Sequence, residues 1–272
     1  MSSITTLDID PVLEPLRTIE AQGFSRHTVF RDWVRLMLAA LQRDDDQYLE
    51  ILDTYGRGEH VAAHFSEAFG ELLAAMADSN QDVLGMAYEE FGMQSDAFGQ
   101  HFTPHTVAAG LAEMQTTDND PDPPVTIADP ACGSGRLLIL AARTHDVQTI
   151  CFGQDKDSLC ARIAALNFCF FNLDGVVACG DSLQMKKRRA WEIQSTICGG
   201  EIREVDPDTV PWPETALHAE TDAAQATEAT DGAPSEIDGP SSEASSNRLA
   251  VEQGDEAATQ ADLDAWLDSS TD

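Results

Sequence analysis

The sequence predicts an α/β protein in which a run of helices precedes a parallel sheet. From residue 11 to about residue 95, apolar residues recur near the helical period of 3.6. From about Val125 onward, short apolar runs alternate with helical segments in the order βαβαβ. Such alternation is typical of a parallel sheet that is wound with helices on both faces. We therefore expect a helical module followed by a doubly wound sheet.

The helical module is predicted from three apolar stripes. They cover residues 30–41, 61–76 and 83–91, and the last one ends at Gly92. Periodicity alone assigns no function to this part of the chain.

The sheet is predicted from three short apolar runs. Strands are expected over 125–129, 149–153 and 176–179, with helices over 136–143 and 158–172 between them. Asp157 is a suitable N-cap for the second helix, which is expected to end near Gly175.

The chain ends in a strongly acidic segment. Residues 205–272 hold 17 of the 48 acidic residues and one of the 16 basic residues, and they contain no phenylalanine. Such a composition buries too little apolar surface to offset the entropy of ordering. We expect three parts: a helical module over 1–95, a ligand-binding core over 96–204 and a disordered acidic tail over 205–272. Within the tail, residues 261–268 form either a short amphipathic docking turn or a solvated end.

The charge of the whole chain limits its partners. The formal net charge is -32, so the overall field repels nucleic acid and anionic membranes, and any contact with DNA must be local. The chain has 3 lysines against 13 arginines and 29 aspartates against 19 glutamates. This bias is typical of proteins that stay soluble in molar salt, and we infer a halophilic, cytoplasmic protein.

Several other classes are not favoured. No apolar run approaches the roughly 20 residues of a membrane span, and the start lacks the basic and apolar regions of a signal peptide. The six cysteines show no C-x-x-C spacing, so buried, reduced thiols are expected rather than a metal site.

The strongest chemical signal is the segment Asp129-Pro-Ala-Cys-Gly-Ser-Gly-Arg, which follows the first strand. Gly133 and Gly135 allow the backbone to turn tightly beneath a ligand and enter a helix. No G-K-[ST] follows, which excludes a phosphate loop, and Leu138 replaces the third glycine of a nicotinamide fingerprint. The acid before the loop suits a ligand with an ammonium group.

Two further acids follow the next two strands. Asp155 lies 26 residues after Asp129 and is placed to accept hydrogen bonds from both ribose hydroxyls. Asp181 follows the third strand, where it is placed to accept a hydrogen bond from an adenine amino group. Three carboxylates at consecutive strand ends describe a site for a nucleoside with a positive tail, and S-adenosylmethionine fits it.

These residues resemble the N6-adenine DNA methyltransferases, particularly the modification subunits of type I restriction systems. Gly99-Gln-His-Phe-Thr-Pro is similar to their GQ-[FY]-[FY]-T-P element, 129–135 to their D-P-A-C-G-S-G motif, and 180–183 to their third motif. Residues 82–91 resemble the helix before the GQ element, so the resemblance covers about 80–184. The implied fold is the Rossmann-like, S-adenosylmethionine-dependent methyltransferase core with a partial sheet, and the implied reaction is methyl transfer to adenine N6 in DNA.

The resemblance also implies roles for single residues. Phe102, Thr103 and Pro104 flank the methionine end of the cofactor, although core packing is an alternative for Phe102. Asp129 addresses the amino group, Asp155 holds the ribose and Asp181 the adenine. The remaining cofactor-binding residues are those of the loop, Ala131, Gly133 and Gly135.

The family's catalytic motif is missing. N-P-P-[YFW] holds the target adenine, and no asparagine of this chain is followed by Pro-Pro. The nearest string, at 122–125, is expected to be a loop that leads into the sheet. After Leu183 only a short strand or hairpin is expected, around 196–198 and 201–203. The basic run at 186–189 either touches phosphates or forms a solvated helix face.

Two functional hypotheses follow. In the first, the chain is an enzyme component that methylates DNA with a second methyltransferase or specificity chain, and binds DNA weakly or only with that partner. In the second, it is an inactive cofactor-binding remnant or a regulatory protein of a mobile element or restriction-modification locus. The sequence identifies no catalytic residue.

Overall fold

A computed structural model describes residues 7–56, 59–93, 102–115 and 123–210 of the chain. The start of the GQ element at 99–101, Asp122 and the acidic segment from 211 onward lie outside the described residues. Residues 205–210, which the sequence assigns to the tail, form the end of a strand and a 3-10 turn, and Val210 is buried.

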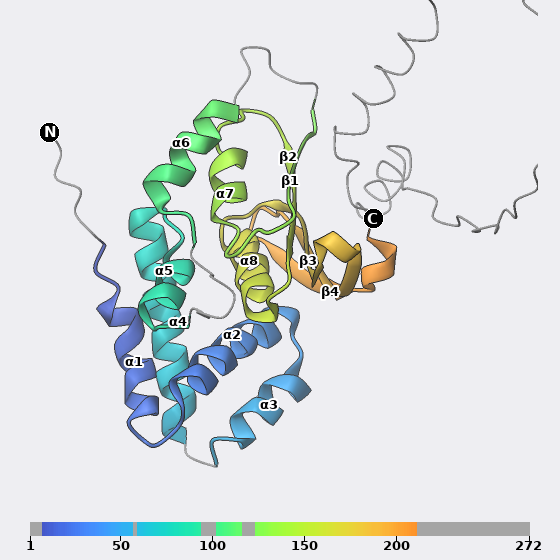
Figure 1. The fold of residues 1–272 in the computed structure, drawn as a ribbon. Helices are drawn as coiled ribbons and strands as arrows, with labels where there is room; N and C mark the ends of the chain where they lie inside the picture. Colours follow the sequence, from blue (N-terminus) through green and yellow to red (C-terminus); the bar gives the residue numbers. More distant parts are fainter. Residues whose placement is uncertain (1–6, 57–58, 94–101, 116–122, 211–272) are drawn as a thin grey trace, which may run out of the picture. The chain divides into compact units, whose positions relative to one another are not determined.

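The first part of the chain is helical, as predicted (Figure 1). Ser25 caps α2 by accepting a hydrogen bond from the Thr28 amide, and Asp82 caps α5 through the Gly85 amide. The helices of this part are α1 (Asp10–Glu20), α2 (Arg26–Gln42), α3 (Asp45–Asp53), α4 (Glu59–Ser79) and α5 (Val83–Glu90). The three apolar stripes lie on α2, α4 and α5, which confirms these predictions.

The βαβαβ order is also confirmed. Its strands are β1 (Val125–Asp129), β2 (Thr149–Asp155) and β3 (Asp174–Asp181), its helices are α7 (Arg136–Ala142) and α8 (Ser158–Phe170), and α6 (His105–Gln115) precedes β1. Asp157 caps α8 through the amides of Leu159 and Cys160, as expected. Pro123 and Pro124 lie in a bend before β1, so the predicted loop is correct there.

The described strands form one five-stranded sheet in the order β1-β2-β3-β4-β5. β1, β2 and β3 pair in parallel, whereas β4 (Lys186–Gln194) and β5 (Glu201–Val205) return antiparallel. The sheet is therefore mixed, and it places the carboxyl ends of β1, β2 and β3 at a single edge. The predicted short strand near 201–203 is β5, and residues 196–198 contribute no strand.

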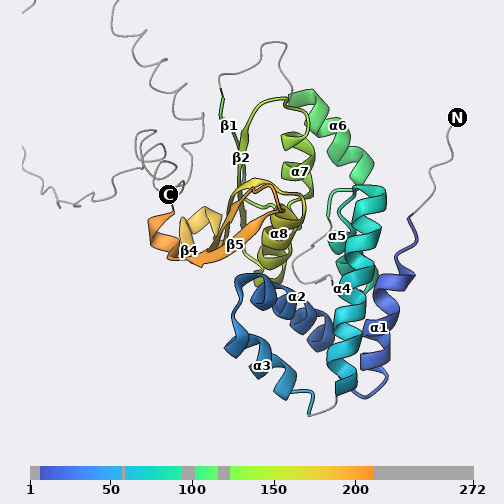
Figure 2. The same cartoon turned by 180° about the vertical axis from the view of Figure 1, so that it is seen from behind.

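Both crossover helices lie on the same face of the sheet, so the prediction of a doubly wound sheet is wrong for the described residues. A Cβ at Gly153 of β2 would lie 3.0 Å from Cys132 and 3.3 Å from Leu138 of α7. Cys151 of the same strand face belongs to the core that α8 fills. Each strand is followed by its neighbour in the same direction, and right-handed crossovers then put every helix on one side. Figures 1 and 2 show α7 and α8 on that side.

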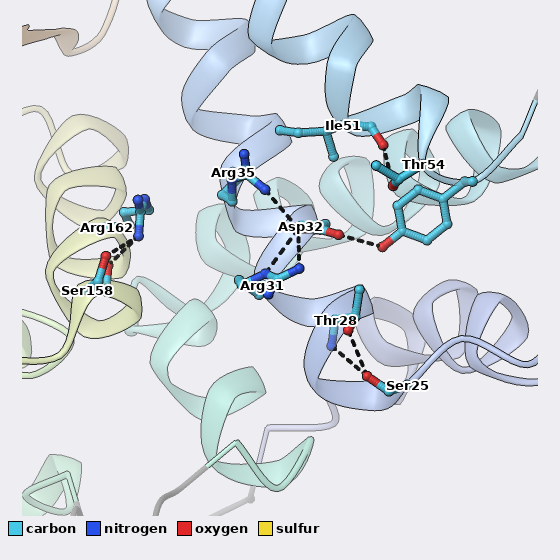
Figure 3. A network of polar contacts seen from close by, with 10 residues as sticks. Ser25, Thr28, Arg31, Asp32, Arg35, Ile51, Thr54, Ser158 and Arg162 are labelled. Carbon is cyan, nitrogen blue, oxygen red and sulfur yellow. Dashed lines mark hydrogen bonds and ion pairs between the residues drawn. The ribbon is translucent and has the colours of Figure 1, made fainter.

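The helical part and the sheet share one hydrophobic core. Helix α2 packs against α8 and β5. On the outer side of α2 the buried carboxylate of Asp32 accepts hydrogen bonds from Arg31 and Arg35 (Figure 3) and from the hydroxyl of Tyr55 at 3.0 Å. This network joins α2 to the residues that follow α3.

The basic run at 186–189 is a strand, which corrects the alternative of a helix face. Residues 186–189 begin β4 and pair with β3. Arg189 forms an ion pair with Glu204 of β5, and Lys187 donates to the carbonyl of Val210. The polar partners expected for these residues are therefore present, but along a strand edge.

The exclusions made from sequence agree with the described residues. Five cysteines are free and buried, and Cys198 is free and exposed. Among the residues that the structure describes, no group of three or more His, Cys, Asp or Glu side chains has the arrangement of a metal site. None of their helices is long and apolar enough to span a bilayer.

Candidate functional site

The loop between β1 and α7 is held open by its own backbone bonds. Gly133 and Gly135 have φ values of 56° and 80°, in the left-handed region that favours glycine. The Ala131 amide donates to the Asp129 carboxylate at 2.9 Å, and the Cys132 amide donates to the Gln154 carbonyl at 2.9 Å. The loop therefore bridges the ends of β1 and β2, as the sequence predicts for a turn beneath a ligand.

Asp155 supports the loop from the end of β2. One carboxylate oxygen accepts a hydrogen bond from the Gly133 amide at 2.9 Å, and the other accepts from the Asp157 amide at 2.8 Å. A carboxylate offers about four lone-pair sites, so these two bonds leave acceptor capacity for a ligand. Asp155 is thus a brace for the glycine loop as well as a candidate ligand contact, a structural role that spacing alone did not indicate.

Asp181 lies at the same edge but is already paired. Its carboxylate is 2.8 Å from the ammonium of Lys156 and accepts a hydrogen bond from the Gln184 amide at 3.2 Å. The hydrogen bond from Lys156 is the main cause that lowers the pKa of Asp181. A ligand amino group at this position has to share the carboxylate with Lys156, a residue that the sequence analysis did not single out.

Phe102 covers the glycine loop. A Cβ at Gly133 would lie 2.9 Å from the Phe102 ring, so glycine is required there for space as well as for conformation. The ring stacks on Tyr88 with centroids 4.9 Å apart and packs against the core. Phe102 therefore touches both the loop and the core, and the two alternatives weighed for it are compatible.

Thr103 and Pro104 continue from Phe102 into α6. Both residues are exposed. The Thr103 carbonyl accepts a hydrogen bond from Arg136 at 2.9 Å, and the Pro104 carbonyl accepts the first amide bonds of α6. The structure thus brings the aromatic segment and the three strand ends to the same side of the loop.

A buried polar cluster behind the loop was missed by the sequence reasoning. Asp82, at the start of α5, is 3% exposed. Its carboxylate accepts hydrogen bonds from four donors, which are the Gly85 amide at 2.7 Å, the Ser134 hydroxyl at 2.6 Å, Arg136 Nε at 3.0 Å and Asn167 Nδ2 at 2.7 Å. We call these side chains, Asp82, Ser134, Arg136 and Asn167, the Asp82 cluster.

The Asp82 cluster connects parts of the chain that are far apart in sequence. Ser134 belongs to the loop, Arg136 begins α7 and Asn167 lies on α8. Arg136 also bonds Glu89 at 3.2 Å as well as the Thr103 carbonyl. One arginine thus ties α5 to the aromatic segment. The only sequence signal was the position of Asp82 as a helix cap, and a cap does not reveal three partners from other elements.

Burial shapes the acid chemistry of the site. Desolvation raises the pKa of Asp129, and it also raises the pKa of Asp155 against the two backbone hydrogen bonds that lower it. A cationic group of a ligand placed between these carboxylates restores their ionised forms. The arrangement favours a ligand that carries positive charge.

The matching proteins are known methylases. The family model N-6 DNA Methylase matches residues 79–198. The chain is 31% identical over 133 residues to the type I restriction enzyme MjaVIII methylase subunit of Methanocaldococcus jannaschii, and the match covers 46% of this chain and 22% of the relative. It is 26% identical over 168 residues to the MjaVII methylase subunit of the same organism, with 57% and 28% covered. The chain thus spans about a quarter of the length of these relatives.

Two solved structures are similar to this chain at a low level. One is a putative class I S-adenosylmethionine-dependent methyltransferase from Listeria monocytogenes, with a TM-score of 0.37, 18% identity and coverage of 64% of this chain and 54% of that one. The other is a type I restriction-modification methyltransferase subunit from Streptococcus thermophilus, with a TM-score of 0.34, 20% identity and coverage of 60% and 36%.

The fold and the matched region define the class, an α/β protein with a methyltransferase core. Residues 79–198 belong to the family of N6-adenine DNA methyltransferases of restriction-modification systems, which confirms the predicted resemblance. The family implies S-adenosylmethionine as the cofactor.

The Asp82 cluster gives a test of stability. In Asp82→Asn one carboxylate oxygen becomes an amide nitrogen, which cannot accept any of the four donors. We expect the free energy of unfolding to fall by roughly 3 kcal/mol, as when a buried ion pair loses one partner. Chemical denaturation in molar KCl measures it.

The matched control is Asp32→Asn. Asp32 is equally buried, but its arginine partners keep side-chain exposures of 42% and 31%. Water therefore compensates for lost bonds, and the expected loss is smaller, about 1 kcal/mol. Equal losses in the two variants would show that the Asp82 cluster has no special weight.

Proposed function

We propose that this chain is the cofactor-binding part of an adenine-specific DNA methyltransferase and that a second polypeptide supplies the groups that hold the adenine. The observation that carries the proposal is the convergence of Asp129, Asp155 and Asp181 around the glycine loop at one edge of the sheet. S-adenosylmethionine, when bound, supplies the methyl group that is transferred.

The residues present fit this cofactor. Asp129 receives one backbone hydrogen bond from its own loop, and burial raises its pKa, so an ammonium group beside it is favourable. Asp155 keeps acceptor capacity for ribose hydroxyls while it braces Gly133. Phe102 leaves no room for a side chain at Gly133, which keeps the loop backbone bare for a ligand.

The adenine-holding half of the reaction has no counterpart in this sequence. Transfer requires that the N6 amino group be held in line with the methyl group while positive charge develops on it. An N-P-P-[YFW] motif does this in the family, and the 272 residues contain no such string. We therefore assign the acceptor site, DNA binding and target recognition to a partner chain. The acid-rich, lysine-poor composition supports action in a halophilic cytoplasm.

The chain is expected to bind S-adenosylmethionine in molar KCl. Asp155→Ala removes the carboxylate that contacts the ribose and braces Gly133, so binding should weaken by about 1–3 kcal/mol. Isothermal titration calorimetry measures both affinities. If the wild-type chain gives neither heat nor a thermal shift with the cofactor, the site assignment is wrong.

Cofactor binding should also depend on acidity. The ionised form of Asp129 favours a cationic ligand, and because its pKa is raised above 3.8, that form is lost at a higher pH than for an ordinary aspartate. Affinity should therefore fall as the pH is lowered toward the raised pKa and recover as the pH increases. Calorimetry of Asp129→Asn should show weaker binding and a flatter pH profile, and an unchanged profile would contradict the role of Asp129.

The isolated chain is expected to methylate DNA negligibly, even with cofactor bound. Extrusion of an adenine costs a few kcal/mol, and this chain has no aromatic platform of the N-P-P-[YFW] type to offset that cost. Transfer of tritiated methyl groups to DNA in molar KCl, with and without candidate partner chains, measures the activity. Robust N6-methyladenine formation by the chain alone would contradict the division of labour proposed above.

Activity that appears only with a partner separates the two functional hypotheses. An inactive remnant or regulatory protein would bind cofactor and remain inactive with each partner chain that carries N-P-P-[YFW].

A further inference from the structure

The first strand of the sheet, β1, has one unpaired edge. Among the described residues β1 pairs only with β2, although it is a parallel strand of a predominantly apolar sheet. Parallel strands are normally covered on all sides. Residues of β2 and β3 are almost all buried, whereas Thr126 and Ala128 of β1 are exposed.

The free hydrogen-bonding groups of β1 can be assigned to residues. The Val125 amide donates to the Gln148 carbonyl at 2.9 Å, so Val125 points its backbone toward β2. Successive residues of a parallel strand direct their backbone groups to opposite sides. Ile127 therefore also faces β2, and the amides and carbonyls of Thr126 and Ala128 point to the open edge.

The two edges of the sheet differ in charge. The outer strand β5 carries Glu201, Arg203 and Glu204. Charged side chains on an edge strand discourage pairing with another chain. Residues 125–128 of β1 are Val, Thr, Ile and Ala and carry no charge. Only the β1 edge is thus suited to accept a further strand.

The helix that leads into β1 carries a second unpartnered feature. Val107, Leu111 and Met114 of α6 are 51%, 41% and 82% exposed, and their spacing places them along one stripe. Ala108 and Ala112 of the same helix are buried, and α6 packs on α7, the helix that covers β1 and β2 (Figure 1).

We propose that β1 accepts a strand from a second polypeptide, which runs parallel to β1 and also covers the apolar stripe of α6. The direction rests on the function proposed above: a parallel strand ends at the same edge as Asp129, so a motif that follows it reaches the cofactor site. Main-chain bonds to Thr126 and Ala128 provide the affinity.

The length and charge of the chain favour a different polypeptide over a second copy. The chain spans only 22% and 28% of its curated relatives, so most of each relative has no counterpart here. Two copies would each bring a net charge of -32, and neither contains N-P-P. Like charge opposes their association unless salt screens it.

The test is amide hydrogen exchange by NMR on the full-length, ¹⁵N-labelled chain in molar KCl. In the free chain, the amides of Thr126 and Ala128 should exchange fast and that of Ile127 slowly. The probe is a synthetic peptide of six alternating valine and threonine residues followed by Asn-Pro-Pro-Tyr. At millimolar concentration it should slow exchange at Thr126 and Ala128 by roughly threefold and leave Ile127 unchanged. The same peptide with a proline inside the valine–threonine run is the control.

Two variants make the result specific. Thr126→Pro removes an outward amide without touching the bonds to β2, and it should abolish the protection, whereas Thr126→Ser should retain it. If Thr126→Pro does not fold, Thr126→Lys places a charge on the edge and should have the same effect.

Three results would overturn the proposal: slow exchange at Thr126 and Ala128 in the free chain, no protection by the peptide, or a dimer in sedimentation velocity that Thr126→Pro abolishes. The last result would identify a second copy as the occupant. Calorimetry with S-adenosylmethionine on the same samples keeps the claims apart, since protection without cofactor binding contradicts only the proposed function.

Discussion

The buried carboxylate of Asp82 is the constraint on which the arrangement of the site depends. It receives donors from α5, the glycine loop, the start of α7 and α8, and it is almost completely excluded from water. A buried carboxylate is stable only when its partners are all in place. The helical part of the chain therefore cannot shift relative to the loop without breaking these bonds. Arg136 extends the constraint to Thr103, and through it to the aromatic ring that lies over Gly133.

This constraint gives the helices before the sheet a function beyond packing. The carbonyl that Arg136 holds lies next to Phe102, and the hydroxyl that Asp82 holds lies between Gly133 and Gly135. The two sides of the proposed cofactor site are thus fixed by the same pair of charged residues. In contrast, Asp32 has an equally buried carboxylate but joins only helical elements, away from the sheet edge (Figure 3).

Local patterns were sufficient for most of the elements and for the position of the loop. The strand at 125–129, the glycines with positive φ and the cap at Asp157 follow from short-range preferences that the sequence displays directly. The strand at 186–194 was missed because four consecutive basic residues hide its alternation, and its pairing with β3 depends on contacts across the chain turn at 182–185. The one-sided winding was missed because βαβ alternation does not specify the order of the strands.

The candidate site was predicted in its residues but not in its bonds. Spacing placed Asp129, Asp155 and Asp181 at one edge, yet it gave no indication that Asp155 braces the loop or that Lys156 pairs with Asp181. The Asp82 cluster joins residues up to 85 positions apart, and no local pattern reports such partners. Long-range polar pairing is thus the part of this molecule that only the folded arrangement reveals.

The most direct test of this account is the affinity of Asp82→Asn for S-adenosylmethionine, measured by calorimetry at a temperature where the variant is fully folded. If the Asp82 cluster positions the site, binding should weaken by roughly tenfold, about 1.4 kcal/mol, while Asp32→Asn binds like the wild type. If Asp82→Asn is less stable but binds the cofactor with wild-type affinity, the cluster only holds the fold together, and the claim that it positions the site is wrong.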